Sequence, residues 1–361
     1  MTRPAVGLAA CALLMMGCGH PVSPAPATTT TDQTIPRPAV QAAVPRPREY
    51  LTRRTLVPPV IDGNLDDAAW RAASWTDFFV DIEGAVRAAP RFRTRAKMLW
   101  DDNYWYIAAE IQEPDLWATV THHDDVIFRD NDFEIFVDPS GTTHRYFEIE
   151  MNQLGTEWDL FLPKPYRDNG SAQNSWEIPG LKLAVAVNGT LNHPGDRDQG
   201  WSVEVAIPWR AFADSGRNVV PPTPGTQWRM NFSRVEWDVD TAAGSYHKRT
   251  DATGKPLPEH NWVWTPQGAI NMHIPEMWGV VQFGGSALAH HPADDAAKWS
   301  LRRVYYAERS YHQSRGSYAT TLTQLGLGEL ARTVTLHGTA TSWNATDAGW
   351  QIDRDGRVWR Q

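Results

Sequence analysis

The sequence predicts an all-β fold, an antiparallel β-sandwich with a small α+β unit at its C-terminus. Short runs of alternating apolar and polar residues, turn residues between these runs, and the scarcity of long helical patterns support the prediction. WDDNYW and DPSGTTHRY have the composition of hairpin turns, whereas only LDDAAWRAA and PWRAFAD have the pattern of helical turns. In order, the strand-like runs are RTRAKMLW, YWYIAAEI, DFEIFVD, RYFEIEMN, TEWDLFL, LKLAVAVN, WSVEVAI, QWRMNFSRVEW and WGVVQF.

The composition is that of a globular protein that does not bind nucleic acid. The chain has 361 residues, of which 42% are hydrophobic and 21% charged, and its formal net charge is -8. An electrostatic nucleic-acid binder needs a basic face to neutralise phosphates, so we exclude that class. The 18 tryptophans are unusually many, and they predict either a tryptophan-rich core or aromatic surfaces that stack on a ligand.

The N-terminus has the pattern of a targeting segment. Residues 1–17 resemble a bacterial lipoprotein signal peptide, in which Arg3 supplies the positive charge and AVGLAACALLMM the apolar segment. Cleavage before Cys18 would leave a lipidated cysteine, so we expect an exported protein anchored to the membrane of the cell envelope, at the outer membrane of a Gram-negative bacterium. The alternative is a signal peptide without lipid. Residues 18–54, rich in Pro, Thr and Ala, are predicted to form a disordered tether.

The pattern changes after the sandwich, which is predicted to span residues 55–284. A linker is predicted at 285–295 and a small α+β unit, a helix plus a hairpin, at 296–361. The helix should have Asp294 or Asp295 near its start and stop at a glycine. The unit distantly resembles the globular part of pilin-like proteins, and we expect it to pack on the sandwich or to bind a protein partner.

Carboxylates gather on two consecutive predicted strands. Glu134 lies on the polar face of DFEIFVD, and Glu148 and Glu150 share a face of the next strand. A glycoside hydrolase needs two carboxylates about 5–5.5 Å or about 6.5–9.5 Å apart, so this cluster leaves a hydrolase acting on O-glycosyl bonds open as an alternative function. An ion-paired sheet face is the structural alternative. No other catalytic signature is present, and we assign no catalytic residue.

Six motifs occur in the order seen in carbohydrate-binding module family 9. They are VIDGNLDDAAW, MLWDDNYWYIAAEIQEPDLW, RDNDFEIFVD, GWSVEVAIPW, RMNFSRVEW and WGVVQF. Over residues 55–284 the chain resembles the family-9-like proteins of bacterial envelopes. The resemblance implies a sandwich of the family-9 or DOMON-like type that binds an oligosaccharide or polysaccharide without cleaving it, in support of glycan capture or degradation.

The resemblance also implies a binding site. In the family, two aromatic rings enclose a terminal sugar while acids and an asparagine bind its hydroxyls. The corresponding residues in this sequence are Phe128 and Trp264 for the rings, Glu134 and Glu113 for the acids, and Asn261. Phe128 stands where the family has tryptophan, and Glu148 where it has arginine.

Metal and haem are the remaining ligand classes. The resemblance implies structural calcium, for which the loops HHDDVIFRDND and GDRDQGW offer hard oxygen ligands. The adjacent histidines in HHDD could ligate a metal, but neighbouring side chains on a loop diverge. Related sandwiches in dehydrogenase cytochromes hold haem between Met and His, so haem is a second alternative, with Met151, Met272 and His273 as candidate ligands.

Overall fold

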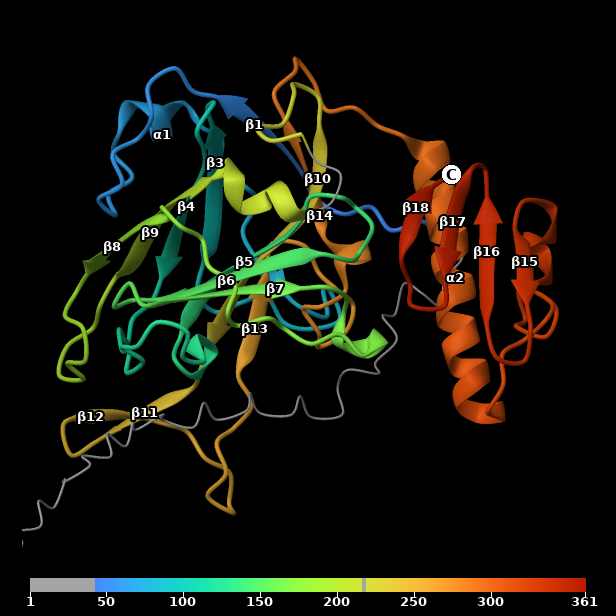
Figure 1. The fold of residues 1–361 in the computed structure, drawn as a ribbon. Coiled ribbons are helices and arrows are strands. Elements are labelled where there is room, and N and C mark those ends of the chain that lie inside the picture. Colours follow the sequence, from blue (N-terminus) through green and yellow to red (C-terminus); the bar gives the residue numbers. More distant parts are fainter. Residues whose placement is uncertain (1–42, 216–218) are drawn as a thin grey trace, which may run out of the picture.

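The computed structural model describes residues 43–215 and 219–361, so the predicted signal peptide, Cys18 and most of the predicted tether lie outside it. Two large sheets pack face to face, and a helix with a smaller sheet lies beside them (Figure 1). None of the helices in the described ranges is long and apolar enough to span a membrane. The strands are β1 Glu49–Arg54, β2 Val80–Asp81, β3 Thr94–Trp100, β4 Tyr104–Gln112, β5 Asp132–Asp138, β6 Tyr146–Asn152, β7 Glu157–Leu162, β8 Lys182–Asn188, β9 Gly200–Pro208, β10 Gln227–Glu236, β11 Val239–Ala242, β12 Ser245–Lys248, β13 His260–Val263, β14 Gly279–Phe283, β15 Thr335–Gly338, β16 Trp343–Asp347, β17 Trp350–Asp353 and β18 Val358–Arg360. The helices are α1 Ala68–Ala72 and α2 Pro292–Arg315, with 3-10 turns η3 Ile127–Arg129, η4 Tyr166–Asp168, η5 Trp209–Ser215, η6 Pro275–Met277 and η7 Gly328–Arg332.

The sandwich prediction is confirmed, with one parallel exception at its centre. The first sheet has the order β7-β6-β5-β10-β14-β1, and the second has the order β1-β3-β4-β9-β8. Strand β1 joins both sheets, because Glu49–Thr52 pair with β14 and Arg53–Arg54 pair with β3, in both cases in parallel. Strand β13 pairs with the end of β10 beyond β14, and β2 pairs with β13.

The position of β1 corrects the predicted tether boundary. This strand lies within the predicted disordered residues 18–54, yet Tyr50 and Thr52 are buried. The Tyr50 hydroxyl donates to the carbonyl of Ser74 at 2.6 Å. The strand is a single short run between Pro- and Arg-rich segments, and both of its partners lie far along the chain. Its sequence therefore carried no local hairpin signal.

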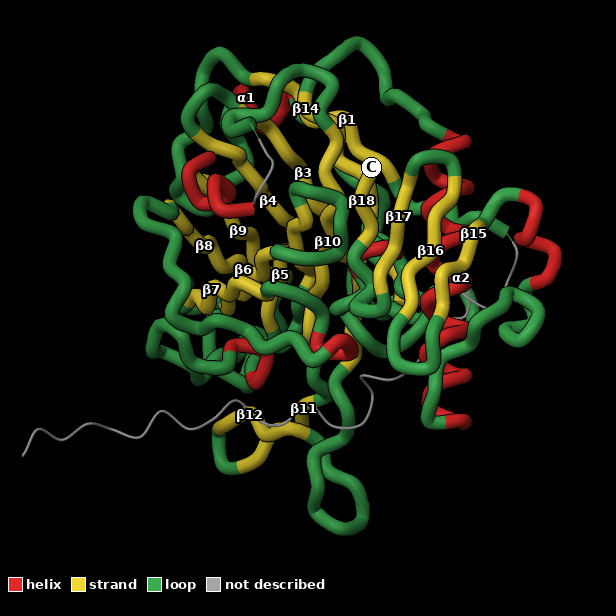
Figure 2. Tube along the Cα trace, turned by 45° about the vertical axis from the view of Figure 1, so that its right-hand side comes forward, coloured by secondary structure: helices red, strands yellow, loops and turns green. Residues whose placement is uncertain are grey.

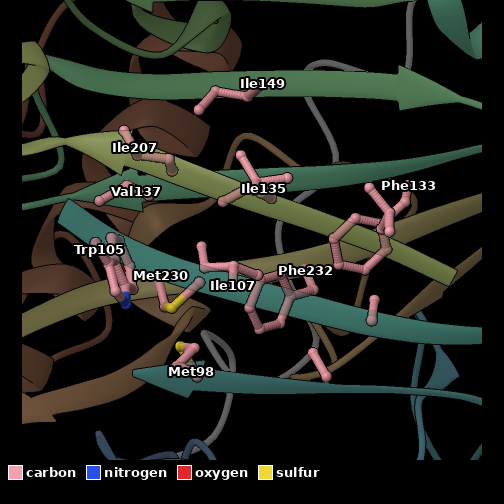
Figure 3. Close-up of a cluster of buried hydrophobic side chains, with 14 of the residues drawn as sticks. Met98, Trp105, Ile107, Phe133, Ile135, Val137, Ile149, Ile207, Met230 and Phe232 are labelled. Carbon is pink, nitrogen blue, oxygen red and sulfur yellow. The ribbon is translucent and has the colours of Figure 1, made fainter. Parts of the chain in front are cut away.

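The core lies between the two sheets and is built from alternating positions. Phe133, Ile135 and Val137 of β5 face residues of the second sheet such as Trp105 and Ile107 (Figure 3). The predicted core tryptophans are confirmed, since their exposed fractions are at most 4%. They are Trp70, Trp100, Trp209 and Trp278.

The C-terminal unit packs directly on the sandwich. Helix α2 packs on one face of its own four-stranded sheet, β15-β16-β17-β18, and strand β18 is the strand nearest the sandwich (Figures 1 and 2). The Val358 amide of β18 donates to the Thr142 carbonyl of the sandwich at 3.1 Å. The helix ends at Arg315 and is capped by Gly316, the glycine at which the sequence pattern predicts its stop, but it begins at Pro292, inside the predicted linker. The hydrophobic core of this unit also includes Ala269, Ile274 and Met277 from the segment before β14. The unit therefore shares part of its core with a sandwich loop.

Candidate functional site

A cavity of about 220 Å³ opens on the outer face of the first sheet, on the side away from the sandwich core. Strands β5, β6 and β7 form its floor, and the segments around Phe128, Tyr166 and residues 259–273 form its walls. The lining residues are Ile82, Phe128, Glu134, Phe136, Glu148, Glu150, Trp158, Leu160, Tyr166, Val235, Glu259, Asn261, Ile270, Asn271, Met272 and His273.

The floor is acidic because of strand alternation. With the odd-numbered residues of β5 in the core, Asp132 and Glu134 point to the outer face. Glu134 pairs directly with Glu150 across β5 and β6, and Glu148 lies two residues further along the same face of β6. Asp132, Glu134 and Glu150 each bring a carboxylate oxygen within 4.8 Å of the others.

These carboxylates are buried without a compensating charge. Burial is the main cause that raises the pKa of Glu134 to about 7. Burial and the neighbouring charge of Glu134 raise the pKa values of Asp132, Glu148 and Glu150 well above their ordinary values. The cavity lining contains neither lysine nor arginine. Burial and the neighbouring negative charges both favour the neutral form of these acids.

Several oxygens of the floor have no hydrogen-bond donor. Asp132 Oδ2, Glu134 Oε2 and Glu148 Oε2 are buried and have no hydrogen-bond partner at normal geometry among the described residues. The Ser233 hydroxyl, opposite Glu134 on β10, nevertheless lowers the pKa of Glu134 against the effect of burial. Two other oxygens of the floor acids each accept a hydrogen bond from the backbone. The Phe128 amide donates to Glu150 Oε2 at 3.1 Å, and the Val235 amide donates to Asp132 Oδ1 at 3.0 Å. Buried polar atoms without partners are costly, so this floor has unused capacity to accept hydrogen bonds.

Aromatic rings form the walls above the acids. The ring of Phe128 lies 6.3 Å from that of Trp158 at an angle of 32°, and both rings line the cavity. His273 stacks edge-to-face on Tyr166 at 4.5 Å and is held by Tyr146, whose hydroxyl lies 3.0 Å from Nδ1. Burial and Arg167 lower the pKa of His273 to about 3, so its ring is neutral at neutral pH.

The structure brings three of the five predicted sugar-binding residues together. Phe128, Glu134 and Asn261 all line the cavity. Glu113 does not, because its Oε2 accepts hydrogen bonds from Arg234 Nη2 at 2.6 Å and from Asn131 Nδ2 at 2.9 Å. Arg234 also bonds Glu236 at 2.6 Å, so Glu113 belongs to a buried ion-pair group rather than to the cavity.

Trp264 is the second correction, because it lies in the core. Its exposed fraction is 1%, and it packs 6.0 Å from the ring of Phe232. The Trp264 amide donates to the Phe232 carbonyl, so the extended backbone of β13 continues past its last residue. Residues three apart on a continuous strand point to opposite faces. With Asn261 in the cavity, Trp264 therefore has to face the core.

The geometry also bears on the two alternative functions. Glu134, Glu148 and Glu150 stand side by side on one sheet face, whereas glycoside hydrolysis requires carboxylates on both sides of the scissile bond. For haem, Met151 is buried in the core, on the opposite face of the first sheet from the cavity that His273 lines. Met151 and His273 therefore cannot ligate one iron. The other candidate, Met272, lines the cavity beside His273.

The predicted calcium loops use their acids for other contacts. Asp130 accepts hydrogen bonds from the amides of Thr119 and Val120, and Asp198 accepts from those of Leu116 and Thr190. Calcium prefers several oxygen ligands. Among the described residues, the group of close ligand atoms that consists only of carboxylates is Asp132, Glu134 and Glu150, on the floor of the cavity.

Sequence reasoning missed most of the cavity walls. Tyr166 and residues 270–273 come from segments with no strand or helix pattern. Residues 270–273 belong to a long segment, 239–276, whose length is a general sign of function, but no such sign marks Tyr166. The hairpin of β11 and β12 projects from this long segment (Figure 1). Trp158, in contrast, could have been found by alternation on β7, where Trp158 and Leu160 share the cavity face.

A larger hollow of about 680 Å³ lies at the second sheet, between Pro58 and Leu183. Its acid, Asp101, already accepts hydrogen bonds from the hydroxyl of Tyr106 at 2.8 Å and from the amides of Asn103 and Tyr104. Without free polar groups that converge on it, this hollow is a weaker candidate than the acidic cavity.

Comparison with known families decides which family the chain belongs to. Residues 61–262, more than half of the chain, match the model of the carbohydrate family 9 binding domain-like family. The chain belongs to this family. The match confirms the resemblance that the six motifs indicated, and it spans the floor of the cavity together with Phe128 and Asn261.

Two relatives are far longer proteins. Exoglucanase XynX from Acetivibrio thermocellus is 27% identical over 157 residues, which are 43% of this chain and 12% of the relative. Endo-1,4-beta-xylanase A from Thermoanaerobacterium saccharolyticum is 26% identical over 165 residues, again 12% of its length. The chain thus covers only a small part of each enzyme.

Two solved structures of a carbohydrate binding module family 9 from Caldicellulosiruptor kristjanssonii are also similar. One is in complex with cellotriose, at 16% identity, and the other with glucose, at 17%. Each is covered completely and matches 68% of this chain with a TM-score of 0.42.

Proposed function

We propose that the protein binds carbohydrate without cleaving it, and that a sugar ring occupies the acidic cavity. The observation that carries this proposal is the set of buried carboxylate oxygens without donors that face a cavity walled by aromatic rings. Sugar hydroxyls donate hydrogen bonds, and those to carboxylates are about twice as strong as neutral ones. Phe128 and Trp158 offer apolar faces for the C–H groups of the ring.

The size of the cavity favours one sugar unit. Its volume of about 220 Å³ is below the roughly 300–1,000 Å³ of pockets for drug-sized ligands. We infer that one ring of an oligosaccharide or polysaccharide enters the cavity and that the rest of the chain lies outside it. Asn261, whose amide can both donate and accept, would contact a hydroxyl beside Glu134.

Family membership supports the same function. The family takes its name from carbohydrate binding, and the two relatives are an exoglucanase and a xylanase in which the matched segment is a small part. The carboxylates stand on one side of the cavity, an arrangement suited to hydrogen bonding rather than to hydrolysis.

The location is a separate proposal that depends on the sequence. We propose that Cys18 is lipidated and anchors the protein to the cell envelope, at the outer membrane of a Gram-negative host. The apolar segment before Gly17-Cys18 and the Pro- and Thr-rich segment after it support this proposal. The substitution Cys18→Ser should release the protein from the membrane fraction, and unchanged membrane association would contradict it.

The test of carbohydrate binding uses the full-length protein. A glycan array, run with calcium and with a chelator, identifies a ligand, and calorimetry then measures its affinity for variants. Glu134→Gln should weaken binding about tenfold or more, since a hydrogen bond to a charged group contributes roughly 1.5–3 kcal/mol. Glu110→Gln is the matched control, because Glu110 is half-exposed on the second sheet and pairs with Arg95.

Two results would contradict the proposal. One is the absence of any bound glycan on the array. The other is a ligand whose affinity is the same for Glu134→Gln, for Glu110→Gln and for the parent protein, because the binding site would then lie elsewhere.

A further inference from the structure

A second group of potential metal ligands lies on the core side of the edge strand β7, away from the acidic cavity. His123, Asp159 and Glu177 each bring one ligand atom within 4.8 Å of the others. The three residues come from distant segments: the loop between β4 and η3, strand β7, and the segment before β8. Trp158 and Leu160 line the acidic cavity, so alternation along β7 points Asp159 to the opposite side.

The spacing of two of the three ligands suits a small tetrahedral ion. His123 Nε2 lies 3.2 Å and 3.4 Å from the two carboxylate oxygens of Glu177, to which it can hydrogen-bond. Zinc binds nitrogen and oxygen ligands at about 2.0–2.2 Å, which in a tetrahedron places neighbouring ligand atoms ~3.4 Å apart. Asp159 has a carboxylate oxygen within 4.8 Å of both, so it would move closer to share an ion with them.

Asp159 supplies an independent sign that a ligand is missing. Its exposed fraction is 1%, and its Oδ1 accepts no hydrogen bond from any described residue. Its charged neighbours Glu177 and Glu157 are both acids, and the Ile178 amide is a hydrogen-bond donor to its carboxylate. A buried carboxylate with negative neighbours and one unpaired oxygen is stabilised by a cation.

His123 identifies the class of cation. Calcium and magnesium prefer oxygen ligands, whereas an imidazole nitrogen favours zinc and other transition metals. The second ring nitrogen, Nδ1, lies 3.8 Å from Glu157 Oε1. A histidine that ligates zinc usually donates its other nitrogen to a carboxylate or carbonyl; at 3.8 Å Glu157 is near Nδ1 but does not hydrogen-bond it.

We propose that His123, Asp159 and Glu177 bind one divalent transition-metal ion, for which zinc is the probe, with water at the remaining position. Asp124 stands beside the site and adds negative charge. The ion would link the loop that carries His123 and the segment that carries Glu177 to β7, the edge strand of the first sheet. The site is separate from the acidic cavity, so the proposal does not depend on carbohydrate binding.

The experiment titrates chelator-treated full-length protein with zinc chloride in a calorimeter, with calcium chloride and magnesium chloride in parallel. We expect one zinc ion per protein, tighter binding of zinc than of calcium, and a higher melting temperature with zinc. His123→Gln and Asp159→Asn should each weaken zinc binding at least tenfold. His122→Gln is the matched control, because the adjacent His122 side chain is 84% exposed and lies near Asp125 instead.

Three outcomes would overturn the proposal. The first is zinc heat that does not saturate beyond that of the buffer. The second is zinc binding by His123→Gln as tight as that of His122→Gln and of the parent. The third is calcium binding tighter than zinc binding and unaffected by His123→Gln, which would indicate a carboxylate site instead. Because His123 is at the surface, its variant tests the ligand even if Asp159→Asn perturbs folding.

Discussion

Glu134, on the floor of the cavity, and Glu276, beneath helix α2, are both buried glutamates, but their pKa values lie on opposite sides of the ordinary one. Burial raises the pKa of Glu134 to about 7. Burial would raise that of Glu276 as well, but Arg167 and Arg302 lower it to about 2. The difference lies in the partners that the fold provides.

The region around Glu276 is internally paired. Arg167 Nη2 donates to both carboxylate oxygens of Glu276 at 2.9 Å, and the Tyr306 hydroxyl donates to one of them at 2.5 Å. The Tyr305 hydroxyl and Arg309 donate to Asp168 nearby, although burial still raises the pKa of Asp168. We call the group of Arg167, Asp168, Glu276, Tyr305 and Tyr306 the paired cluster.

The paired cluster also holds one wall of the cavity. Tyr166 precedes Arg167 in the chain, and Arg167 Nη1 donates to the carbonyl of His273 at 3.4 Å. Helix α2 contributes Tyr305 and Tyr306 to this cluster. The comparison teaches that buried acids with partners in the fold support the structure, whereas buried acids without them are available to a ligand.

Removal of the central cation of the paired cluster should have the largest effect. Arg167→Leu removes the cation that bonds both oxygens of Glu276, while Arg309 still pairs with Asp168. The loss of a partner from a buried ion pair costs about 3–5 kcal/mol of unfolding free energy. Chemical denaturation of the variant and of the parent measures this cost. Arg197→Leu is the control, because the Arg197 side chain is 71% exposed in its pair with Asp115 and should change stability by no more than ~1 kcal/mol. If both variants lost the same small amount of unfolding free energy, the paired cluster would not stabilise the fold more than a surface ion pair does.

Neutralisation of Glu134 on the cavity floor should raise the free energy of unfolding, whereas Arg167→Leu should lower it. The folded pKa of Glu134, about 7, lies above its unfolded value of 4.5, so the folded state binds the proton more tightly. Stability therefore falls as the pH rises from 4.5 through 7. Glu134→Gln removes this loss and should stabilise the protein on the order of 1–3 kcal/mol at pH 8, with little change at pH 4.5.

Glu276→Gln provides the contrasting pH profile. The folded pKa of Glu276, about 2, lies below the unfolded value of 4.5. Its contribution is complete above pH 4.5 and is lost as the pH falls towards 2, so the variant should be destabilised most at neutral pH. Denaturation curves between pH 3 and pH 8 distinguish the two profiles. Parallel profiles for the two variants would show that both glutamates have the same environment.

The alternation of apolar and polar residues along the strands predicted which face of the sheet the acids occupy. The structure places Glu134, Glu148 and Glu150 on that face. The family resemblance predicted Asn261 and Trp264 as sugar-binding residues. It could not show that the backbone stays extended between them, which turns the Trp264 side chain towards the core. Glu113 failed as a site residue for a different reason. Its partner Arg234 is 121 residues away in the chain, and no local pattern reveals such a pair.

Ligand binding should itself depend on pH if sugar hydroxyls donate to the floor acids. Such donors stabilise the carboxylate form, so the ligand lowers the pKa of Glu134 and releases a proton. Affinity should then rise with pH up to about 7, by about tenfold for each unit by which the pKa is lowered. Calorimetry at several pH values measures this effect, and Glu134→Gln should make the profile flatter. An affinity that falls as the pH rises would exclude hydroxyl donation to this carboxylate.

The smallest effect is expected from the aromatic wall. Phe128 is partly exposed above the floor, and its backbone is held by Glu150 and by the indole of Trp237, whose Nε1 donates to the Phe128 carbonyl at 2.9 Å. Phe128→Ala removes the ring but keeps these backbone contacts. Glycan affinity should therefore fall by roughly 0.5–1.5 kcal/mol beyond the effect of the lost area, the range for an aromatic contact.

Trp264→Ala is the counterpart from the core, and it should separate binding from stability. Removal of a buried tryptophan costs about 3–5 kcal/mol of unfolding free energy, whereas Phe128→Ala should leave the melting temperature nearly unchanged. Calorimetry measures affinity and thermal melts measure stability, and both are applied to both variants. Phe128→Ala should change mainly the affinity, and Trp264→Ala mainly the stability. If Phe128→Ala lowers the melting temperature as much as Trp264→Ala does and leaves affinity unaltered, Phe128 is a packing residue and the ligand must contact a different wall of the cavity.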